Sequence, residues 1–136
     1  MISVEVVSEE KKWSKKIKKK EVFFYSICKS FPKKYKFINK KIFLTLLLSN
    51  NKGIKKLNKK FRNKNKPTDI LSFPHQKKII LKNNLYLGDI IISYNFMNKP
   101  KNQKISLFKD KVIKTFIHGF LHLLSFDHIK LKDYKK

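Results

Sequence analysis

The chain has 136 residues, 41% of them hydrophobic, and its formal net charge is +25. This length suits one domain spanning residues 1–136, and no run of eighteen or more apolar residues is present to cross a membrane. The opening "MISVEVVSEE" lacks the basic-then-apolar pattern of a signal peptide, and a single cysteine, Cys28, excludes an internal disulfide. We therefore expect a cytoplasmic protein that does not contact membranes.

The excess of basic residues, 34 against nine acidic ones, favours nucleic acid or another polyanion as a partner. A second explanation competes with this one. Arg62 is the only arginine and alanine is absent, while lysine, asparagine, isoleucine and phenylalanine abound. Such a bias is typical of a genome with A/T-rich codons. The charge supports an RNA partner but does not establish one.

The first half of the chain contains two predicted strands and two predicted helices. The alternation in "ISVEVV" (2–7) predicts a strand. Residues 12–30 carry apolar side chains among lysines and predict one basic, partly amphipathic helix that ends before Pro32. The apolar run "KIFLTLLLS" (41–49) predicts a strand covered on both faces. The stretch "NNKGIKKLNKKFRN" (50–63) has apolar residues at helical spacing and predicts a short helix.

The second half continues the alternation of strands and helices. Strands are predicted for "TDILSFP" (68–74) and "YLGDIIIS" (86–93), with "QKKIILKNN" between them as a loop or short strand. A short helix near "YNFMN" precedes a long apolar helix over residues 106–124. Helices interleaved with four strands imply a compact α+β or α/β layer structure.

Three of the four histidines lie within "HGFLHLLSFDH" (118–128). His118 and His122 are four residues apart and therefore lie about 40° from each other around a helix, so both imidazoles can reach one metal ion. His128 can join them only if the helix ends first, and "SFD" (125–127) is the predicted turn. Three neutral imidazoles with one open position are typical of a catalytic zinc site. Histidines without a ligand are the alternative.

The spacing His-x3-His-x5-His is also that of the metzincin zinc peptidases. Those enzymes carry a glutamate directly after the first histidine as their general base. Here that position is Gly119, so the ligand set is kept while peptide hydrolysis loses its proton acceptor. We also expect Gly119 to leave room for a large group beside the metal.

Three ordered stretches resemble the YbeY endoribonucleases. "HGFLHLLSFDH" is similar to the family's H-G-x-L-H-L-x-G-[YF]-D-H signature. "LNKKFRNKNKPTDILSFP" (57–74) is similar to its L-N-x-x-[FY]-R…T-D-V-L-S-F-P block, and "LGDIIIS" (87–93) to its L-G-D-I-x-I-S block. The resemblance extends from about Leu57 to His128. It covers more than half of the chain.

The resemblance implies an α+β fold with a mixed sheet of about four strands packed with helices, and a metal site on the last long helix and the following turn. It implies one Zn²⁺ held by His118, His122 and His128. It implies a zinc-dependent, single-strand-specific endoribonuclease whose partners are precursor rRNA and the small ribosomal subunit. Its cellular role would be 16S rRNA 3′-end maturation and ribosome quality control.

Arg62 falls on the family's arginine, and we predict a catalytic role for it beside His118 and His122. A guanidinium binds a phosphodiester through two parallel hydrogen bonds, which lysine cannot do. An ordinary surface arginine is the alternative. Asn58 and Asp69 are candidates for contacting substrate, with a helix-surface amide and a strand-entry turn as their alternatives. Asp127 is a candidate for orienting a histidine ligand, or it caps the local turn.

Two features depart from the family pattern. The family has glycine where Ser125 stands, and serine in a left-handed conformation costs about 1–2 kcal/mol. The family also continues with an acidic helix, whereas this chain closes on the short basic "IKLKDYKK". The main rival hypothesis is a non-catalytic RNA-binding ribosome-assembly factor with a structural zinc, and a basic RNA-binding protein without metal is another. The sequence leaves the attacking nucleophile, the general base and the oligomeric state open.

Overall fold

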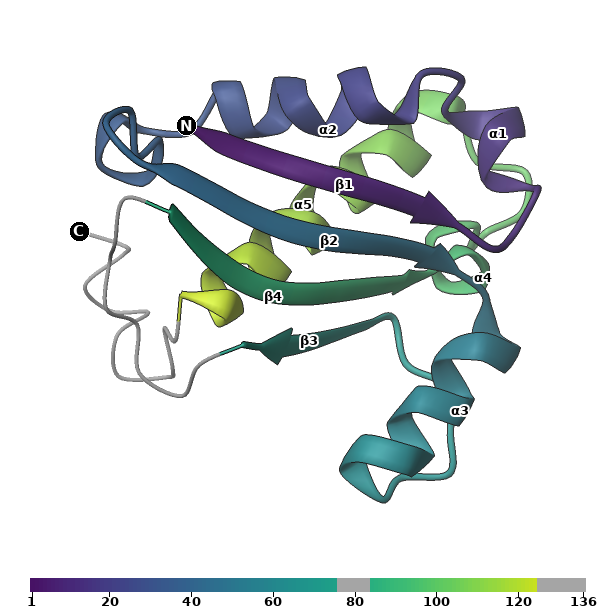
Figure 1. The fold of residues 1–136 in the computed structure, drawn as a ribbon. Coiled ribbons are helices and arrows are strands. Elements are labelled where there is room, and N and C mark those ends of the chain that lie inside the picture. The colour runs from purple at the N-terminus through teal and green to yellow at the C-terminus, as the bar shows by residue number, and fades with distance from the viewer. Residues whose placement is uncertain (76–83, 125–136) are drawn as a thin grey trace.

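A four-stranded mixed sheet organises the chain (Figure 1). The computed structural model describes residues 1–75 and 84–124. Its strands are β1 (Ile2–Ser8), β2 (Lys41–Ser49), β3 (Ile70–Pro74) and β4 (Asn84–Ser93), in the order β1-β2-β4-β3. The first three strands in that order are parallel, and β3 pairs antiparallel with β4 at the edge. The predicted α+β fold with a mixed sheet of four strands is confirmed.

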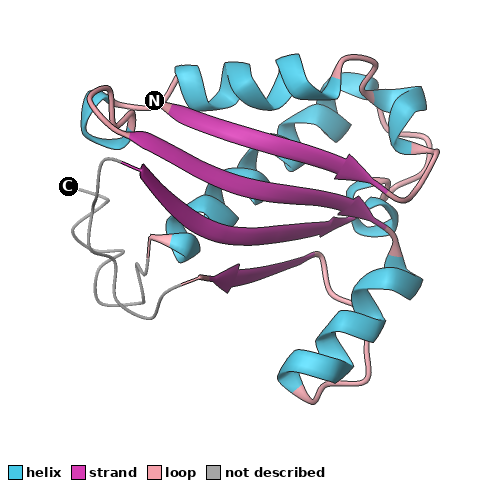
Figure 2. Cartoon of the chain, viewed as in Figure 1, coloured by secondary structure: helices cyan, strands magenta, loops and turns pink. Residues whose placement is uncertain are grey.

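Helices cover the two faces of this sheet unequally (Figure 2). One face packs against α2 (Lys20–Lys29) and the long α5 (Ile105–Leu123). Of the helices that the structure describes, only α3 (Asn51–Arg62) lies against the other face, near the carboxyl ends of the parallel strands. The short helices α1 (Trp13–Lys16) and α4 (Tyr94–Met97) and a 3₁₀ turn over Lys33–Tyr35 complete the described elements.

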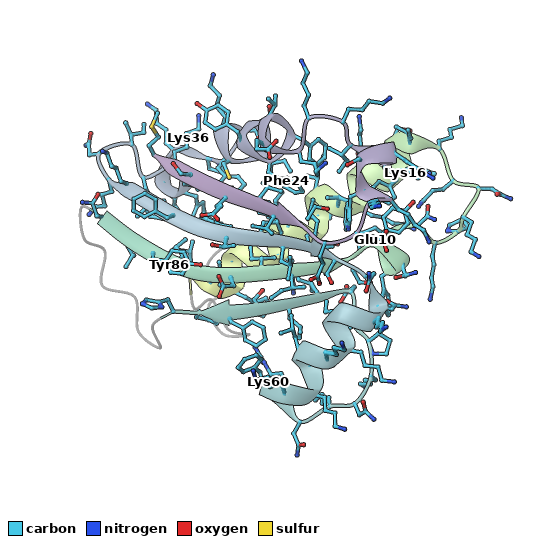
Figure 3. All side chains as sticks on the ribbon, turned by 45° about the vertical axis from the view of Figure 1, so that its right-hand side comes forward. Glu10, Lys16, Phe24, Lys36, Lys60 and Tyr86 are labelled. Carbon is cyan, nitrogen blue, oxygen red and sulfur yellow. The ribbon has the colours of Figure 1, made fainter. Side chains whose placement is uncertain are left out.

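The main hydrophobic core lies between the sheet and the helices α2 and α5, among the side chains drawn in Figure 3. Its aromatic rings pack edge to face or tilted, as in the pair Phe24 and Phe116, whose centroids are 5.2 Å apart. This packing fixes α5 against the sheet, which matters because α5 carries two of the candidate metal ligands. The largest fully buried rings are Trp13, Phe24, Phe108, Phe116 and Phe120.

The single helix predicted over residues 12–30 is wrong, because the chain forms two helices separated by an extended Ile17 (φ −127°, ψ 106°). The indole of Trp13 packs on Phe108 and Tyr94 and donates a 2.9 Å hydrogen bond to the carbonyl of Ser49. The break lets α1 pack at the end of the sheet where β2 finishes at Ser49. The helix α2 then runs back along β1 (Figure 1).

The strand predicted over residues 41–49 is confirmed as β2, but the prediction that both its faces are covered is wrong. Leu44, Leu46 and Leu48 point into the core and are 0–1% exposed. On the opposite face Phe43 is 38% exposed, and Leu47 is half-buried. The sequence of β2 suggested burial on both faces because the side chains on its open face are also hydrophobic. Part of the face opposite α5 is therefore accessible.

Candidate functional site

Two exposed histidines of α5 form the centre of the candidate site. Their spacing places His118 and His122 one turn apart on the same side of the helix. The two Nε2 atoms lie 3.0 Å from each other, and the ring centroids lie 4.6 Å apart. The two nitrogens are within hydrogen-bonding distance of each other, and they are close enough for both to bind one metal ion.

Gly119, between these histidines, determines how closely α5 approaches the sheet. It is buried, and a Cβ added there would lie 2.7 Å from Cδ1 of Ile70 and 3.2 Å from both Cγ2 of Ile90 and Oγ of Ser72. Position 119 therefore faces β3 and β4, and the expected room beside the metal is wrong. A glutamate at this position would be directed into the sheet, which also excludes the zinc-peptidase arrangement.

Arg62 approaches the region of the two histidines from the other side of β3. It is the last residue of α3, and its Nη2 donates a 2.7 Å hydrogen bond to the carbonyl of Ser72. Its guanidinium carbon lies 5.3 Å from the centroid of the Phe73 ring. The hydroxyl of Ser72 lies 3.5 Å from the carbonyl of Gly119. Ser72 of the edge strand thus links Arg62 to the helical turn that carries both histidines.

The donor chemistry of the pair fits a zinc ion, since neutral imidazole is a common zinc ligand. Over residues 1–75 and 84–124 no group of three or more histidine, cysteine or carboxylate side chains is arranged to hold a metal. The third predicted ligand, His128, lies outside the described residues, as do Asp127 and Ser125. The complete zinc site therefore stays a prediction, and the described residues include two of its three predicted ligands.

The other two candidates lie in different surroundings. Asn58 is buried on α3, and its Nδ2 donates a 2.9 Å hydrogen bond to the carbonyl of Lys66, which holds the loop between α3 and β3. Asp69 is exposed at the start of β3, and its Oδ1 lies 3.2 Å from the hydroxyl of Thr68. The contacts of Asn58 indicate a structural role, whereas Asp69 stays open to solvent near α5.

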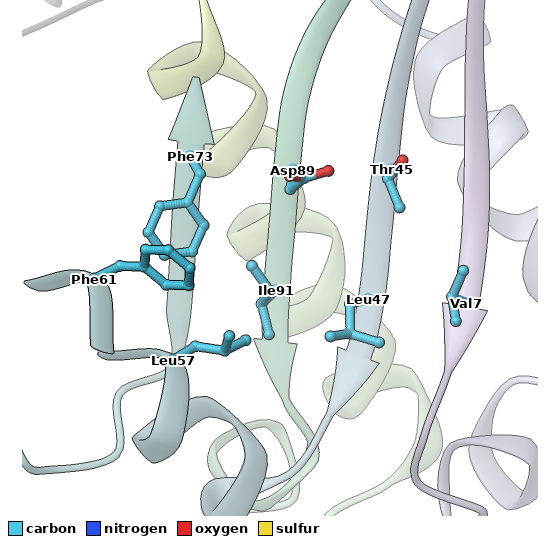
Figure 4. A pocket seen from close by; sticks show the side chains of 8 residues that line it. All are labelled: Val7, Thr45, Leu47, Leu57, Phe61, Phe73, Asp89 and Ile91. Atoms are coloured by element: carbon cyan, nitrogen blue, oxygen red, sulfur yellow. The ribbon is translucent and has the colours of Figure 1, made fainter. Parts of the chain in front are cut away.

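The exposed part of the opposite sheet face contains a cavity of about 450 Å³ (Figure 4). Its walls are mostly apolar, and Phe61 and Phe73 pack edge to face at one end with centroids 5.3 Å apart. Asp89 and Thr45 lie at the upper end in this view. The cavity therefore adjoins the Phe73 ring that Arg62 covers. It is lined by Val7, Thr45, Leu47, Leu57, Phe61, Phe73, Asp89 and Ile91.

A β-bulge brings together the polar side chains of Tyr86, Asp89 and Thr45 at this cavity. The sequence pattern did not predict this arrangement. The register of β2 and β4 shifts after Phe43, and Gly88 has a φ of +140°. This shift places Tyr86 and Asp89, three residues apart, on one face of the sheet. Tyr86 donates a hydrogen bond to Asp89, and its oxygen lies 2.8 Å from Oγ1 of Thr45. The isolated glycine inside a strand pattern was the available signal.

Tyr86 should make the protein less stable at high pH. Burial raises the pKa of this tyrosine above its ordinary 10.0, the hydrogen bond to Asp89 raises it further, and Thr45 lowers it. The folded state thus retains a proton that the unfolded chain releases above pH 10, so stability is complete below that pH and falls as pH rises beyond it. We expect Tyr86→Phe to flatten this fall in denaturant unfolding experiments. Equal slopes for the two proteins would contradict the assignment.

Comparison with known proteins identifies the family. A family model described as Endoribonuclease YbeY matches residues 2–136. The chain belongs to the YbeY endoribonuclease family, whose members are hydrolases that act on RNA. The resemblance noted in the sequence is thereby confirmed.

Individual relatives agree with this assignment. Endoribonuclease YbeY of Pelagibacter ubique is 71% identical over 136 residues, a match that spans 100% of this chain and 89% of the relative. Endoribonuclease YbeY of Ehrlichia canis is 36% identical, over 92% of this chain and 79% of its own length. A Thermotoga maritima protein solved in solution superposes with a TM-score of 0.54 at 26% identity and covers 94% of this chain and 75% of its own.

Among the residues that the structure describes, no helix has the length and apolar character that crossing a membrane requires.

Proposed function

We propose that the chain is a zinc-dependent endoribonuclease, specific for single-stranded RNA, that forms one domain over residues 1–136. We propose that it acts in the cytoplasm on precursor 16S rRNA, in 3′-end maturation and ribosome quality control at the small ribosomal subunit. Family membership supports the nuclease chemistry. The net charge of +25 is consistent with an RNA substrate.

The observation that carries the proposal is the convergence of the His118 and His122 Nε2 atoms to 3.0 Å. Within the proposal these two residues and His128 hold one zinc ion. When bound, zinc supplies Lewis acidity that polarises a water molecule or a phosphate oxygen. The exposure of both imidazoles leaves the ion accessible to an RNA strand, which a buried structural site would not.

Arg62 would bind the phosphate at this site. Its exposed guanidinium is held by the Ser72 carbonyl and by the ring of Phe73, so its orientation is fixed before substrate arrives. Only one of its five N–H groups is needed for the Ser72 hydrogen bond. The others can donate to the non-bridging oxygens as negative charge develops on them.

Replacing Arg62 tests the proposal against its rival. We expect Arg62→Ala to lower the cleavage rate about 10²-fold, the effect of losing one preorganised donor to a developing oxyanion. Arg62→Lys should recover only part of this loss, since it keeps the charge but not the paired hydrogen bonds. The measurement is the initial rate on a precursor 16S rRNA 3′-end fragment with zinc-loaded protein.

Lys60→Ala is the matched control, because Lys60 is an exposed cation two residues away on α3 whose Nζ lies 5.2 Å from the ring centroid of Phe61. Melting curves of all variants should confirm that they remain folded. If Arg62→Ala assembles ribosomes normally and the wild type does not cleave, the non-catalytic assembly factor is the better account.

A further inference from the structure

The exposed side of α5 that carries the histidines continues towards the start of the helix. At 3.6 residues per turn, residues 111, 114, 115, 118 and 122 fall within an arc of about 100° and therefore share one side of the helix. Lys111, Lys114 and Thr115 thus lie in line with His118 and His122. From His118 to Lys111 this line extends about 10 Å, at 1.5 Å per residue.

A hollow of about 330 Å³ lies beside this part of α5. The rim is basic, with an exposed Lys114 and a Lys111 whose ammonium donates a hydrogen bond to the carbonyl of Lys99. Lys99 in turn holds its Nζ 4.9 Å from the centroid of the Phe96 ring. The hollow is lined by Asp69, Phe96, Met97, Lys111, Lys114 and Thr115.

We propose that this hollow binds the single-stranded RNA that flanks the scissile phosphate, so that the substrate runs along α5 from the histidine pair towards Lys111. The inference rests on the proposed function, because it assigns a further subsite of the same substrate. The line of about 10 Å from His118 to Lys111 is short enough for one RNA strand to contact both ends of it. The strand therefore reaches the hollow while its cleaved bond lies at His118 and His122.

The chemistry of the hollow fits this occupant. Lys111 and Lys114 line the hollow with the single carboxylate of Asp69, and the ammonium of Lys99 lies over the lining ring of Phe96. The balance of charge therefore favours a phosphate backbone. The half-buried ring of Phe96 provides an apolar surface, and basic side chains beside an aromatic ring are the usual elements of a groove for unpaired nucleotides. Paired bases have no free face to stack on such a ring, which agrees with the proposed preference for single strands.

Two substitutions test the subsite: one removes a positive charge from the hollow and the other removes a negative charge. Lys114→Gln should weaken binding of a labelled single-stranded RNA several-fold and reduce the slope of log K against log salt by about 0.7, the value for one phosphate contact. Asp69→Asn removes the opposing charge and should strengthen binding. Fluorescence anisotropy in a chelating buffer measures both effects without cleavage of the probe. With zinc-loaded protein, Lys114→Gln should raise KM and leave kcat nearly unchanged.

Lys29→Gln is the matched control, since Lys29 is an exposed lysine at the end of α2, on the far side of β1 from β3. It removes the same charge without touching the hollow. Equal weakening by Lys29→Gln and Lys114→Gln, or no gain from Asp69→Asn, would overturn the proposal. Because the binding assay needs no catalysis, a chain that binds as expected but never cleaves would refute the nuclease function and leave the subsite standing.

Discussion

Replacing His122 by alanine should remove the zinc ion and lower the rate of RNA cleavage about 10³-fold. In the wild-type protein the Nε2 atoms of His118 and His122 lie 3.0 Å apart. The variant keeps only one of these two imidazoles, and we expect the remaining ligands to hold zinc too weakly to retain it. Metal ions contribute several kcal/mol to stabilising a phosphoryl transition state. A loss of about 4 kcal/mol corresponds to a rate about 10³-fold lower. Zinc content after gel filtration and cleavage of the precursor 16S rRNA fragment are the two measurements.

His75→Ala is the control for this experiment because it removes an exposed imidazole elsewhere. His75 follows β3 and packs edge-on against Tyr86 at a centroid distance of 5.4 Å. We expect this variant to keep zinc and activity. Purifying both variants in the same way also exposes contaminating ribonucleases, which would cleave equally in the two preparations. Full zinc content in His122→Ala would refute the metal site itself.

Gly119→Ala should be the most damaging single-methyl change near the site. The new Cβ would lie 2.7 Å from Cδ1 of Ile70, so either the Ile70 side chain must turn away or α5 must move away from β3. Overpacking of this kind costs about 1–3 kcal/mol of stability. The movement would also separate the histidines from Arg62, which is held on the opposite side of Ser72. Denaturant unfolding should show the loss of stability, and cleavage should fall together with it.

Ile70→Val removes the atom that the new methyl group would meet. If Gly119 is required for close packing, the double variant should be more stable than the sum of the two single effects predicts, as expected for residues in contact. Additive effects would mean that Gly119 matters for another reason. Cleavage by the double variant should recover in parallel with stability, because α5 can then approach the strand again.

Sequence patterns predicted the sheet well because each strand is a short, mostly apolar run bounded by turn residues. They failed for residues 12–30, where the spacing of apolar residues fits one continuous helix but Trp13 packs on Tyr94 of α4 and Phe24 on Phe116 of α5. Periodicity records which residues are apolar and not which neighbour each contacts. The same limitation made the open face of β2 look buried, since Phe43 and Leu47 remain accessible.

At the site, the sequence predicted the pairing of His118 with His122, because helical geometry alone determines it. It did not predict that Ser72 would connect Arg62 to α5, since this contact depends on where an antiparallel edge strand lies in three dimensions. The role of Gly119 was misjudged for a related reason. A glycine in a sequence signals close approach, but only the fold tells which neighbour approaches.

The hydrogen bond from Arg62 to Ser72 has a further consequence for the solution behaviour of the protein. In the described sheet β3 is an edge strand, and the main-chain groups of edge strands can pair with strands of other molecules. The guanidinium occupies one carbonyl of this edge, and Pro74 at the end of the strand offers no N–H. We therefore expect Arg62 also to reduce edge-to-edge aggregation, and variants lacking it should be prepared at low concentration.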